Sequence, residues 1–338
     1  MSIVMTGGGT GGHLAIVKAV KEQLKGEELV YIGSTIGQDR AWFEEDKDFT
    51  ATYFLETRGV VNQKGAGKLK SLWMMLLAVI KARRLLKKHD ATVVFSVGGF
   101  SSAATAFAAK SAGIPLVIHE QNAALGSLNK LLRPYAVAFL SSYLEESPIQ
   151  EYPVKEIFFE KARLRKRVET VIFLGGSQGA KAINTLALEL APKLKEKGIK
   201  IIHQAGEKNV DAVRQVYEKE GIDAEVFGFT TRLAEYMSEA DFAIARAGAS
   251  TLWELSAMAL PTLFIPYPYA ASDHQYYNAQ FLVEKGLAWV MREDALNAEK
   301  VLALLDEDLE AKSRGLMETI QRGGSKKIAE LLKKYIKT

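Results

Sequence analysis

The sequence predicts an α/β protein built from two Rossmann-like domains, each a doubly wound parallel sheet, that face a cleft. Short apolar runs alternate with helix-length segments along the chain, as in parallel sheets covered by helices on both faces. A glycine-rich turn follows an apolar run twice, at residues 7–12 and at 175–179. The length of 338 residues also suits about two domains.

The first half of the chain contains four predicted strands with helices between them. The strands are expected at residues 2–5, 28–33, 91–96 and 115–118. Helices are expected at 14–25, at 68–88 and in the alanine-rich segment that follows Phe100. This order repeats the strand–helix unit from which a parallel sheet is assembled.

The pattern breaks into polar, proline-containing sequence at residues 147–167, which is interpreted as the interdomain connection. The expected domains are 1–152 and 153–321, and a terminal helix at about 322–338 is expected to pack back on the first domain. The second half restarts the scheme with a helix at 181–195. Its strands are expected at 170–174, 199–203, 225–227, 242–245 and 262–265.

The cysteine content, the net charge and the first residues of the sequence limit the classes of protein to which the chain can belong. The chain has no cysteine, which excludes disulfides and thiolate metal sites and fits a reducing compartment. Its formal charge of +4 is too small to imply nucleic-acid binding. The beginning of the sequence lacks the basic and cleavage regions of a signal peptide, so secretion is not expected.

The most informative stretch is 246–255, which follows the apolar run 241–245. Small residues at a strand-to-helix turn expose backbone N–H groups at a helix N-terminus, where an anion is favoured. Glu254 lies one turn into that helix, where a carboxylate can accept both hydroxyls of a ribose. With the polar cluster 273–279 downstream, the stretch indicates a nucleotide-diphosphate pocket.

The first glycine turn satisfies the Gly-x-Gly-x-x-Gly pattern, which is weak by itself. A dinucleotide site would need an acid at the end of the second strand, and that position reads Gly33-Ser34-Thr35. A tight turn needed only for packing is the alternative. We favour a backbone that approaches a diphosphate or sugar, and the second turn at 175–179 suggests one activated donor.

Three of the five histidines, His13, His119 and His274, fall on predicted ligand-side loops. Histidine suits proton abstraction near neutral pH. His13 is favoured as the general base, and Glu120 is the second candidate. His89 and His203 are interpreted as structural.

No metal site and no cofactor are expected. Asp46-Lys47-Asp48 matches the Asp-x-Asp pattern that holds a metal in some nucleotide-sugar enzymes. It lies in a charged run with no strand before it, so a solvated face is the favoured interpretation. Helix N-termini, backbone N–H groups and hydroxyls would then stabilise a leaving diphosphate.

The predicted helix at 68–88 is apolar on one side and strongly basic. Between Glu56 and Asp90 there are nine basic residues and no acid. A core-facing helix with a basic outer face is one interpretation, and a membrane-surface patch that meets anionic lipid is the favoured one. The apolar patch residues are Leu69, Leu72, Trp73, Leu76 and Ile80.

The motifs as a set resemble the MurG family, the peptidoglycan glycosyltransferases that convert lipid I into lipid II. The resemblance spans residues 8 to 279 in order, so it covers most of the chain. It is carried by Gly8-Gly9-Thr10-Gly11-Gly12-His13, Gly98-Gly99-Phe100, His119-Glu120-Gln121-Asn122, Gly175-Gly176-Ser177-Gln178-Gly179-Ala180, Arg246-Ala247-Gly248-Ala249-Ser250-Thr251 with Glu254, His274-Gln275 and Asn278-Ala279.

The resemblance implies a GT-B fold in which the C-terminal domain holds UDP-N-acetylglucosamine. Glu254 would bind the ribose, the backbone near Thr230 would read the uracil, and Gln275 and Asn122 would contact the sugar. Inversion at the anomeric carbon would proceed without a metal. The remaining implied substrate contacts are Thr10, Gly11, Gly12, Lys155, Ser177, Ala249, Ser250, Thr251, Leu252 and Trp253.

The sequence departs from the family pattern at two places. Residues 14–17 read Leu-Ala-Ile-Val where the family has a proline soon after the histidine. At the interdomain connection, 151–155 read Glu-Tyr-Pro-Val-Lys in place of Gly-Asn-Pro-x-Arg. Lys155 keeps the positive charge of that arginine but lacks its bidentate fork.

The resemblance implies a peripheral enzyme on the cytoplasmic face of the cell membrane, with UDP-N-acetylglucosamine and lipid I as substrates. Another GT-B enzyme that uses this donor, such as a glycolipid synthase or a 2-epimerase, is the nearest alternative. A nicotinamide oxidoreductase and a non-catalytic membrane scaffold are more distant ones. A scaffold would not need two small-residue turns together with Glu254.

Overall fold

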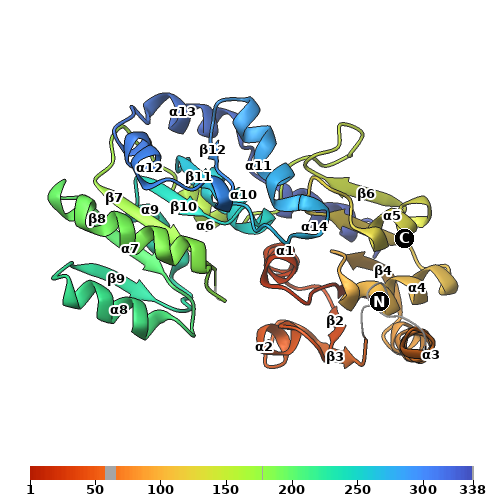
Figure 1. The fold of residues 1–338 in the computed structure, drawn as a ribbon. Helices are drawn as coiled ribbons and strands as arrows, with labels where there is room; N and C mark the ends of the chain where they lie inside the picture. The colour runs from red at the N-terminus through yellow and green to blue at the C-terminus, as the bar shows by residue number, and fades with distance from the viewer. Residues whose placement is uncertain (58–65, 177, 337–338) are drawn as a thin grey trace. The chain divides into compact units, whose positions relative to one another are not determined.

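The computed structural model describes residues 1–57, 66–176 and 178–336, and the side chains of residues 66–70 lie outside this description. The chain divides into two compact units (Figure 1). The first comprises Met1–Val154 and Gly323–Thr338, and the second comprises Lys155–Arg322. Each unit contains a six-stranded sheet, so the predicted doubly wound α/β fold is confirmed.

In the first unit the strand order is β3-β2-β1-β4-β5-β6, and neighbouring strands are parallel. The strands are β1 Ser2–Thr6, β2 Leu29–Ser34, β3 Ala51–Leu55, β4 Ala91–Ser96, β5 Leu116–Glu120 and β6 Ala138–Ser141. The helices are α1 Gly11–Lys21, α2 Asp39–Phe43, α3 Ala66–Lys88, α4 Ala103–Ala112, α5 Ser127–Leu132 and α14 Gly324–Lys333, with short 3₁₀ turns η1 Phe100–Ser102 and η2 Arg133–Tyr135.

In the second unit the order is β12-β11-β10-β7-β8-β9, again parallel throughout. The strands are β7 Thr170–Leu174, β8 Lys200–Gln204, β9 Ala224–Phe227, β10 Phe242–Ala245, β11 Thr262–Phe264 and β12 Trp289–Val290. The helices are α6 Glu156–Glu160, α7 Lys181–Glu196, α8 Val210–Lys219, α9 Leu233–Glu239, α10 Ala249–Ala257, α11 His274–Glu284, α12 Ala298–Leu305 and α13 Glu310–Thr319, with 3₁₀ turns η3 Ala271–Asp273 and η4 Glu293–Ala295.

The central strands form because both of their faces are covered. Every residue of β1, β2, β5, β7 and β10 is buried, which explains why these strands are rich in apolar residues. Helix α7 packs on the second sheet with an apolar stripe at helical spacing that includes Ile183, Leu186 and Leu190. Alternation of buried strand and amphipathic helix thus builds one core in each unit.

Each sheet has one position where the strand order reverses, between β1 and β4 in the first unit and between β7 and β10 in the second. Connections lead away to opposite sides there, which leaves a crevice at the carboxyl ends of the strands where ligands of open α/β sheets bind. The loops 7–10 and 97–99 follow β1 and β4, and the loops 175–180 and 246–248 follow β7 and β10. The glycine-rich motifs therefore lie at the two switch points.

The structure differs from the predicted elements at the sheet edges and at the start of α1. Strands β3, β6 and β12 are outermost, and their residues are largely half-buried, so their apolar signal is weak. Helix α1 begins at Gly11 and not at residue 14, which places Gly11, Gly12 and His13 in its first turn.

The end of the chain completes the first unit. Helix α14 packs against α1, and a Cβ atom on Gly324 would lie 2.3 Å from the backbone oxygen of Glu151. Lys327 forms an ion pair of 2.6 Å with Glu151, and the hydroxyl of Ser325 donates to the backbone oxygen of Val154 at 3.1 Å. Glycine at 324 is thus required for close approach of the two segments.

Candidate functional site

A buried carboxylate, Asp39, organises the glycine loop after β1. Asp39 is fully buried and accepts hydrogen bonds from the backbone nitrogens of Gly9 at 2.7 Å and Ser34 at 3.0 Å, and from the hydroxyl of Ser101. The hydroxyl of Tyr31 lies 3.0 Å from the same carboxylate. Burial, together with the charge of Asp39, raises the pKa of the Tyr31 phenol well above its ordinary value. Asp39 therefore joins the loops after β1, β2 and β4.

Close packing explains part of the glycine run. A Cβ atom on Gly8 would lie 2.6 Å from a carboxylate oxygen of Asp39. Gly99 has a φ of +78°, and a Cβ atom there would lie 2.7 Å from the backbone oxygen of Gly8. The packing interpretation of the turn therefore holds for Gly8, where a side chain would displace the carboxylate that fixes the loop.

The imidazole of His13 is held from both sides in the first turn of α1. Its Nδ1 lies 2.8 Å from the hydroxyl oxygen of Thr10, which is exposed. Its Nε2 lies 2.5 Å from the side-chain nitrogen of Gln121, which is buried. His119, on β5, is also buried, and burial together with nearby His13 lowers its pKa to about 3. His119 is therefore neutral at physiological pH.

The carboxylate of Glu120 is occupied by donors of its own loop. It is 1% exposed and accepts hydrogen bonds from the backbone nitrogens of Asn122 at 3.1 Å and Gly126 at 2.9 Å. The side-chain nitrogens of Asn129 and Asn122 lie 2.9 and 3.4 Å from it. These contacts shape the loop between β5 and α5. Of the two candidate bases, the geometry therefore favours the half-buried His13 over Glu120.

The Asp46-Lys47-Asp48 segment is engaged by a lysine of α1. The ammonium of Lys21, which is 4% exposed, lies 2.6 Å from Asp46 and 2.8 Å from Asp48. The hydrogen bond and charge of Lys21 lower the pKa of Asp48. Among the described residues there is no group of three or more His, Cys, Asp or Glu side chains able to hold a metal.

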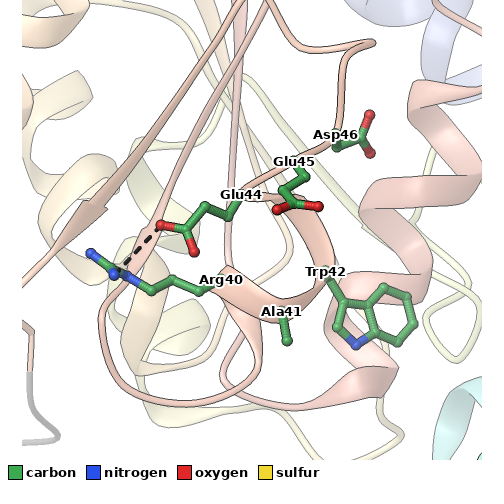
Figure 2. A pocket seen from close by; sticks show the side chains of 6 residues that line it. All are labelled: Arg40, Ala41, Trp42, Glu44, Glu45 and Asp46. Carbon is green, nitrogen blue, oxygen red and sulfur yellow. Dashed lines mark ion pairs between the residues drawn. The ribbon is translucent and has the colours of Figure 1, made fainter.

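A hollow over α2 adjoins that segment. Figure 2 shows its lining, in which Arg40 pairs with Glu44 at 3.5 Å. The lining residues are Arg40, Ala41, Trp42, Glu44, Glu45 and Asp46. None of the predicted substrate contacts is among them.

In the second unit, helix α10 begins with uncapped backbone amides. Its N-cap, Gly248, has an extended backbone and no side chain that could accept a hydrogen bond from the first turn. Ala249 is buried, while Ser250 and Thr251 are half-buried. Backbone N–H groups at such a helix start favour an anion. The hydroxyl of Ser250 donates to Glu254 at 3.1 Å, so it turns toward the carboxylate one turn on.

Glu254 is a partly buried carboxylate whose protonation is sensitive near neutral pH. Burial raises its pKa to about 7, against the opposing effects of the Ser250 hydrogen bond and the positive charge of Lys155. Lys155 is the N-cap residue of α6, and α6 packs against α10. The structure therefore brings Lys155 into the electrostatic environment of Glu254.

Two predicted contacts on α10, Leu252 and Trp253, belong to the core. Leu252 is fully buried, and its backbone nitrogen donates to the oxygen of Gly248 at 2.9 Å. Trp253 is 6% exposed and stacks on Phe281 with ring centroids 5.0 Å apart. The ring of Trp253 therefore fixes α10 against α11, and contact of Leu252 and Trp253 with a ligand stays a prediction.

Arg246, at the end of β10, is a structural clamp that the sequence motif alone did not explain. Its guanidinium donates to the backbone oxygens of Ile265 at 3.1 Å and Pro266 at 3.2 Å and pairs with Glu293. It also lies over the ring of Tyr267, 5.5 Å from the centroid. The clamp fixes the loop that follows β11.

The polar start of α11 is tied to the same loops. The side-chain oxygen of Gln275 accepts a hydrogen bond from the backbone nitrogen of Tyr267 at 2.9 Å. The side chain of buried Asn278 donates to the backbone oxygen of Ala247 at 3.2 Å. Gln275 and Asn278 therefore hold the loops after β11 and β10 beside the start of α10.

The other predicted contacts of the second unit lie on loops after β7 and β9. A Cβ atom on Gly206 would lie 2.3 Å from the backbone nitrogen of Gly179, so the loops after β7 and β8 touch through their backbones. Thr230, after β9, accepts a hydrogen bond from the backbone nitrogen of Arg232 at 3.0 Å. Ser177 lies outside the described residues.

Helix α3 presents two different faces. Ala78, Ala82 and Leu86 are buried against the first unit, where α3 packs on α4 (Figure 1). Large apolar side chains on the remaining surface are exposed, Trp73 by 60%. The exposed set is Leu72, Trp73, Leu76, Leu77 and Ile80, and the side chain of Leu69 lies outside the described residues. Neither the core-facing nor the patch interpretation alone describes this helix.

Within the described part of the chain, none of the helices combines the length and apolar character needed to cross a bilayer.

Two relatives that share one name match the chain over nearly its full length. It is 80% identical over 338 residues to a UDP-N-acetylglucosamine--N-acetylmuramyl-(pentapeptide) pyrophosphoryl-undecaprenol N-acetylglucosamine transferase of Sulfurovum sp. (strain NBC37-1), covering 100% of both chains. The transferase of the same name from Wolinella succinogenes is 53% identical over 334 residues, covering 98% of this chain and 99% of that one.

A solved structure and two domain families agree with these relatives. The crystal structure of Acinetobacter baumannii MurG is 27% identical with a TM-score of 0.80, covering 98% of this chain and 99% of that chain. Residues 3–141 match the N-terminal domain of glycosyltransferase family 28, and residues 170–335 match its C-terminal domain. The chain therefore belongs to glycosyltransferase family 28.

Proposed function

We propose that this chain transfers N-acetylglucosamine from UDP-N-acetylglucosamine to the 4-hydroxyl of the N-acetylmuramyl group of lipid I, which forms lipid II. The observation that carries the proposal is the 80% identity, over the whole of both chains, to a transferase named for this donor and acceptor. The α10 N-terminus, with Glu254 one turn on, supports the donor half of the proposal.

Donor binding is assigned to the second unit. The backbone amides of Ala249, Ser250 and Thr251 would hold the diphosphate, together with Ser177, because a helix N-terminus stabilises negative charge. Glu254 would accept hydrogen bonds from the ribose hydroxyls, and its contact with Ser250 shows that its oxygens are within reach of the helix start.

The contacts to the uracil and the sugar are assigned by residue. The backbone near Thr230 would read the uracil, and Gln275 and Asn122 would contact the sugar. Lys155 would add positive charge near the donor, and its effect on the pKa of Glu254 supports a place beside that carboxylate. A lysine provides a point charge without bidentate geometry.

Acceptor activation is assigned to the first unit, with Thr10, Gly11 and Gly12 near the reacting groups. His13 would take the proton of the acceptor hydroxyl while its oxygen forms a bond to the anomeric carbon. In the same step the bond from that carbon to the β-phosphate oxygen breaks, and UDP leaves with the electron pair. A single displacement inverts the configuration of the carbon.

The leaving diphosphate would be stabilised without a metal. Its negative charge would fall on the uncapped amides at the start of α10. Asp46 and Asp48 match the Asp-x-Asp sequence pattern of metal-binding enzymes, but both form ion pairs with Lys21. These ion pairs support a reaction without a metal. Addition of EDTA is therefore expected to leave the rate unchanged.

The enzyme would meet its lipid acceptor as a peripheral protein on the cytoplasmic face of the cell membrane. The exposed side chains of Leu72, Trp73, Leu76 and Ile80 support insertion of α3 into the interface. Exposed basic residues in the last turns of the same helix, Arg83, Arg84 and Lys87 among them, would attract anionic lipid.

The test is incubation of the full chain with UDP-N-acetylglucosamine labelled in the sugar and a lipid I analogue. UDP release that requires the acceptor, with label in a disaccharide product, is the expected result. Conversion of the donor to its 2-epimer without an acceptor would support the epimerase alternative and overturn the proposal. Transfer to a glycolipid acceptor in preference to the lipid I analogue would support the glycolipid synthase.

A further inference from the structure

The side-chain carboxamide of Gln121 contacts the imidazole of His13 through its nitrogen, while its oxygen lacks a hydrogen-bond partner among the described residues. Gln121 is 5% exposed and follows β5 directly. Its side-chain nitrogen lies 2.5 Å from Nε2 of His13. Its Oε1 is buried and has no hydrogen-bond partner among the described residues. A buried acceptor left in this state destabilises the fold, because its hydrogen bonds to water are lost without replacement.

A half-turn of the carboxamide exchanges its oxygen and nitrogen and places Oε1 against Nε2 of His13. Oε1 of Gln121 then accepts a hydrogen bond from Nε2–H of His13. With its proton on Nε2, the neutral imidazole keeps the lone pair of Nδ1 as its only acceptor. This Nδ1 atom lies 2.8 Å from the hydroxyl of Thr10, and Thr10 is exposed.

We propose that Gln121 is a positioning residue that fixes His13 in the Nε2–H tautomer and thereby makes Nδ1 the proton acceptor. The inference rests on the proposed function, in which His13 is the general base. The exposed hydroxyl of Thr10 then marks where the acceptor hydroxyl would lie against Nδ1. Gln121, the buried partner, thus sets the tautomer of His13. The acceptor hydroxyl would replace the hydroxyl of Thr10, the exposed partner, at Nδ1.

Other titratable groups near the imidazole do not provide this control. His119, on the same strand as Glu120, is neutral because burial lowers its pKa to about 3. The carboxylate of Asp39 accepts hydrogen bonds from the backbone nitrogens of Gly9 and Ser34, and that of Glu120 from donors of its own loop. Gln121 is a buried polar side chain that contacts Nε2 of His13.

The direct test is ¹⁵N NMR of the full chain with labelled histidine, in which the five histidine signals are resolved and His13 is assigned from a His13→Gln variant. The ¹⁵N shifts of a neutral imidazole distinguish its two tautomers. The Nε2–H form at His13 is the expected result, and the Nδ1–H form would overturn the inference. This readout does not depend on transferase activity, so it separates failure of the inference from failure of the proposed function.

The kinetic test compares Gln121→Met with Gln121→Glu. Loss of tautomer control in Gln121→Met should lower kcat by about tenfold or more, while the affinity for UDP is unchanged. In Gln121→Glu the added carboxylate should raise the pKa of His13 and move the acid limb of the kcat/KM profile to higher pH. Gln23→Met, beyond the end of α1, is the matched control and should retain wild-type kcat.

A wild-type kcat in folded Gln121→Met would overturn the inference, as would an acid limb that does not move in Gln121→Glu. If either variant fails to fold, the tautomer of His13 in the wild-type chain still decides the question.

Discussion

The partly buried carboxylate of Glu254 predicts an unusual dependence of stability on pH. Its pKa is about 7 in the folded chain against an ordinary value of 4.5. Between these values the unfolded chain releases the proton and the folded chain retains it, so stability falls as pH rises. The difference of about 2.5 units corresponds to about 3 kcal/mol, an upper value because part of the side chain contacts water.

Replacement of Glu254 by glutamine removes this titration with little change of shape. At pH 8 the Glu254→Gln variant should be more stable than wild type by up to about 3 kcal/mol, and the difference should shrink toward zero near pH 4.5. Urea unfolding at several pH values measures it. Glu189→Gln, on the exposed surface of α7, is the control and should follow the wild-type curve.

The same titration should control nucleotide affinity if the ionised carboxylate binds the ribose. With a pKa of about 7, the ionised share of Glu254 rises from about a tenth at pH 6 to about nine tenths at pH 8. The affinity of the wild-type protein for UDP should therefore rise about tenfold over this range. Titration of the UDP phosphate also changes the affinity with pH, and the Glu254→Gln variant measures that contribution alone, so the tenfold rise is the difference between the two proteins. Calorimetry at each pH measures both proteins. If wild type and variant had parallel pH profiles, the assigned role of Glu254 would be refuted.

Three other perturbations test the remaining assignments. His13→Ala should lower kcat by about a hundredfold or more with UDP affinity unchanged, and a near-normal rate would exclude it as the base. Replacement of Leu72, Trp73 and Leu76 by serine should abolish co-sedimentation with anionic vesicles while circular dichroism stays unchanged; continued binding would argue against α3 as the membrane contact. Asp39→Asn should lower the free energy of unfolding by about 1–3 kcal/mol, because an NH2 group replaces one carboxylate oxygen and cannot accept the hydrogen bonds donated to it. An unchanged denaturation midpoint would contradict the role of Asp39 in the loop.

The fold was predictable from the sequence where burial leaves a strong signal. Central strands such as β1 and β7 are buried on both faces, so their apolar runs are continuous and unambiguous. Edge strands β3 and β12 have one neighbouring strand and half-buried residues, so nothing in their sequence stands out. The start of α1 was placed too late because glycine favours a loop, although three loop residues adopt the helical conformation.

The candidate site was predictable where residue type and spacing coincide. Glu254 was found because its distance from the small-residue turn places it one helical turn from the amides. Asp39 was missed because it lies outside both glycine motifs, and its contacts to Gly9 and Ser101 join segments distant in sequence. A single buried acid close after a strand gives no periodic signal. Its role becomes visible only when those segments are brought together.

The return of α14 to the first unit has a consequence for biosynthesis. Residues 155–322 form the second unit as one uninterrupted stretch, whereas the first unit needs the last sixteen residues of the chain. On the ribosome, the second unit can fold as soon as its stretch has emerged, but the first gains helix α14 only after the second unit has been synthesised. Nascent chains arrested shortly after residue 322 would thus carry an uncovered α1, a natural recognition point for chaperones.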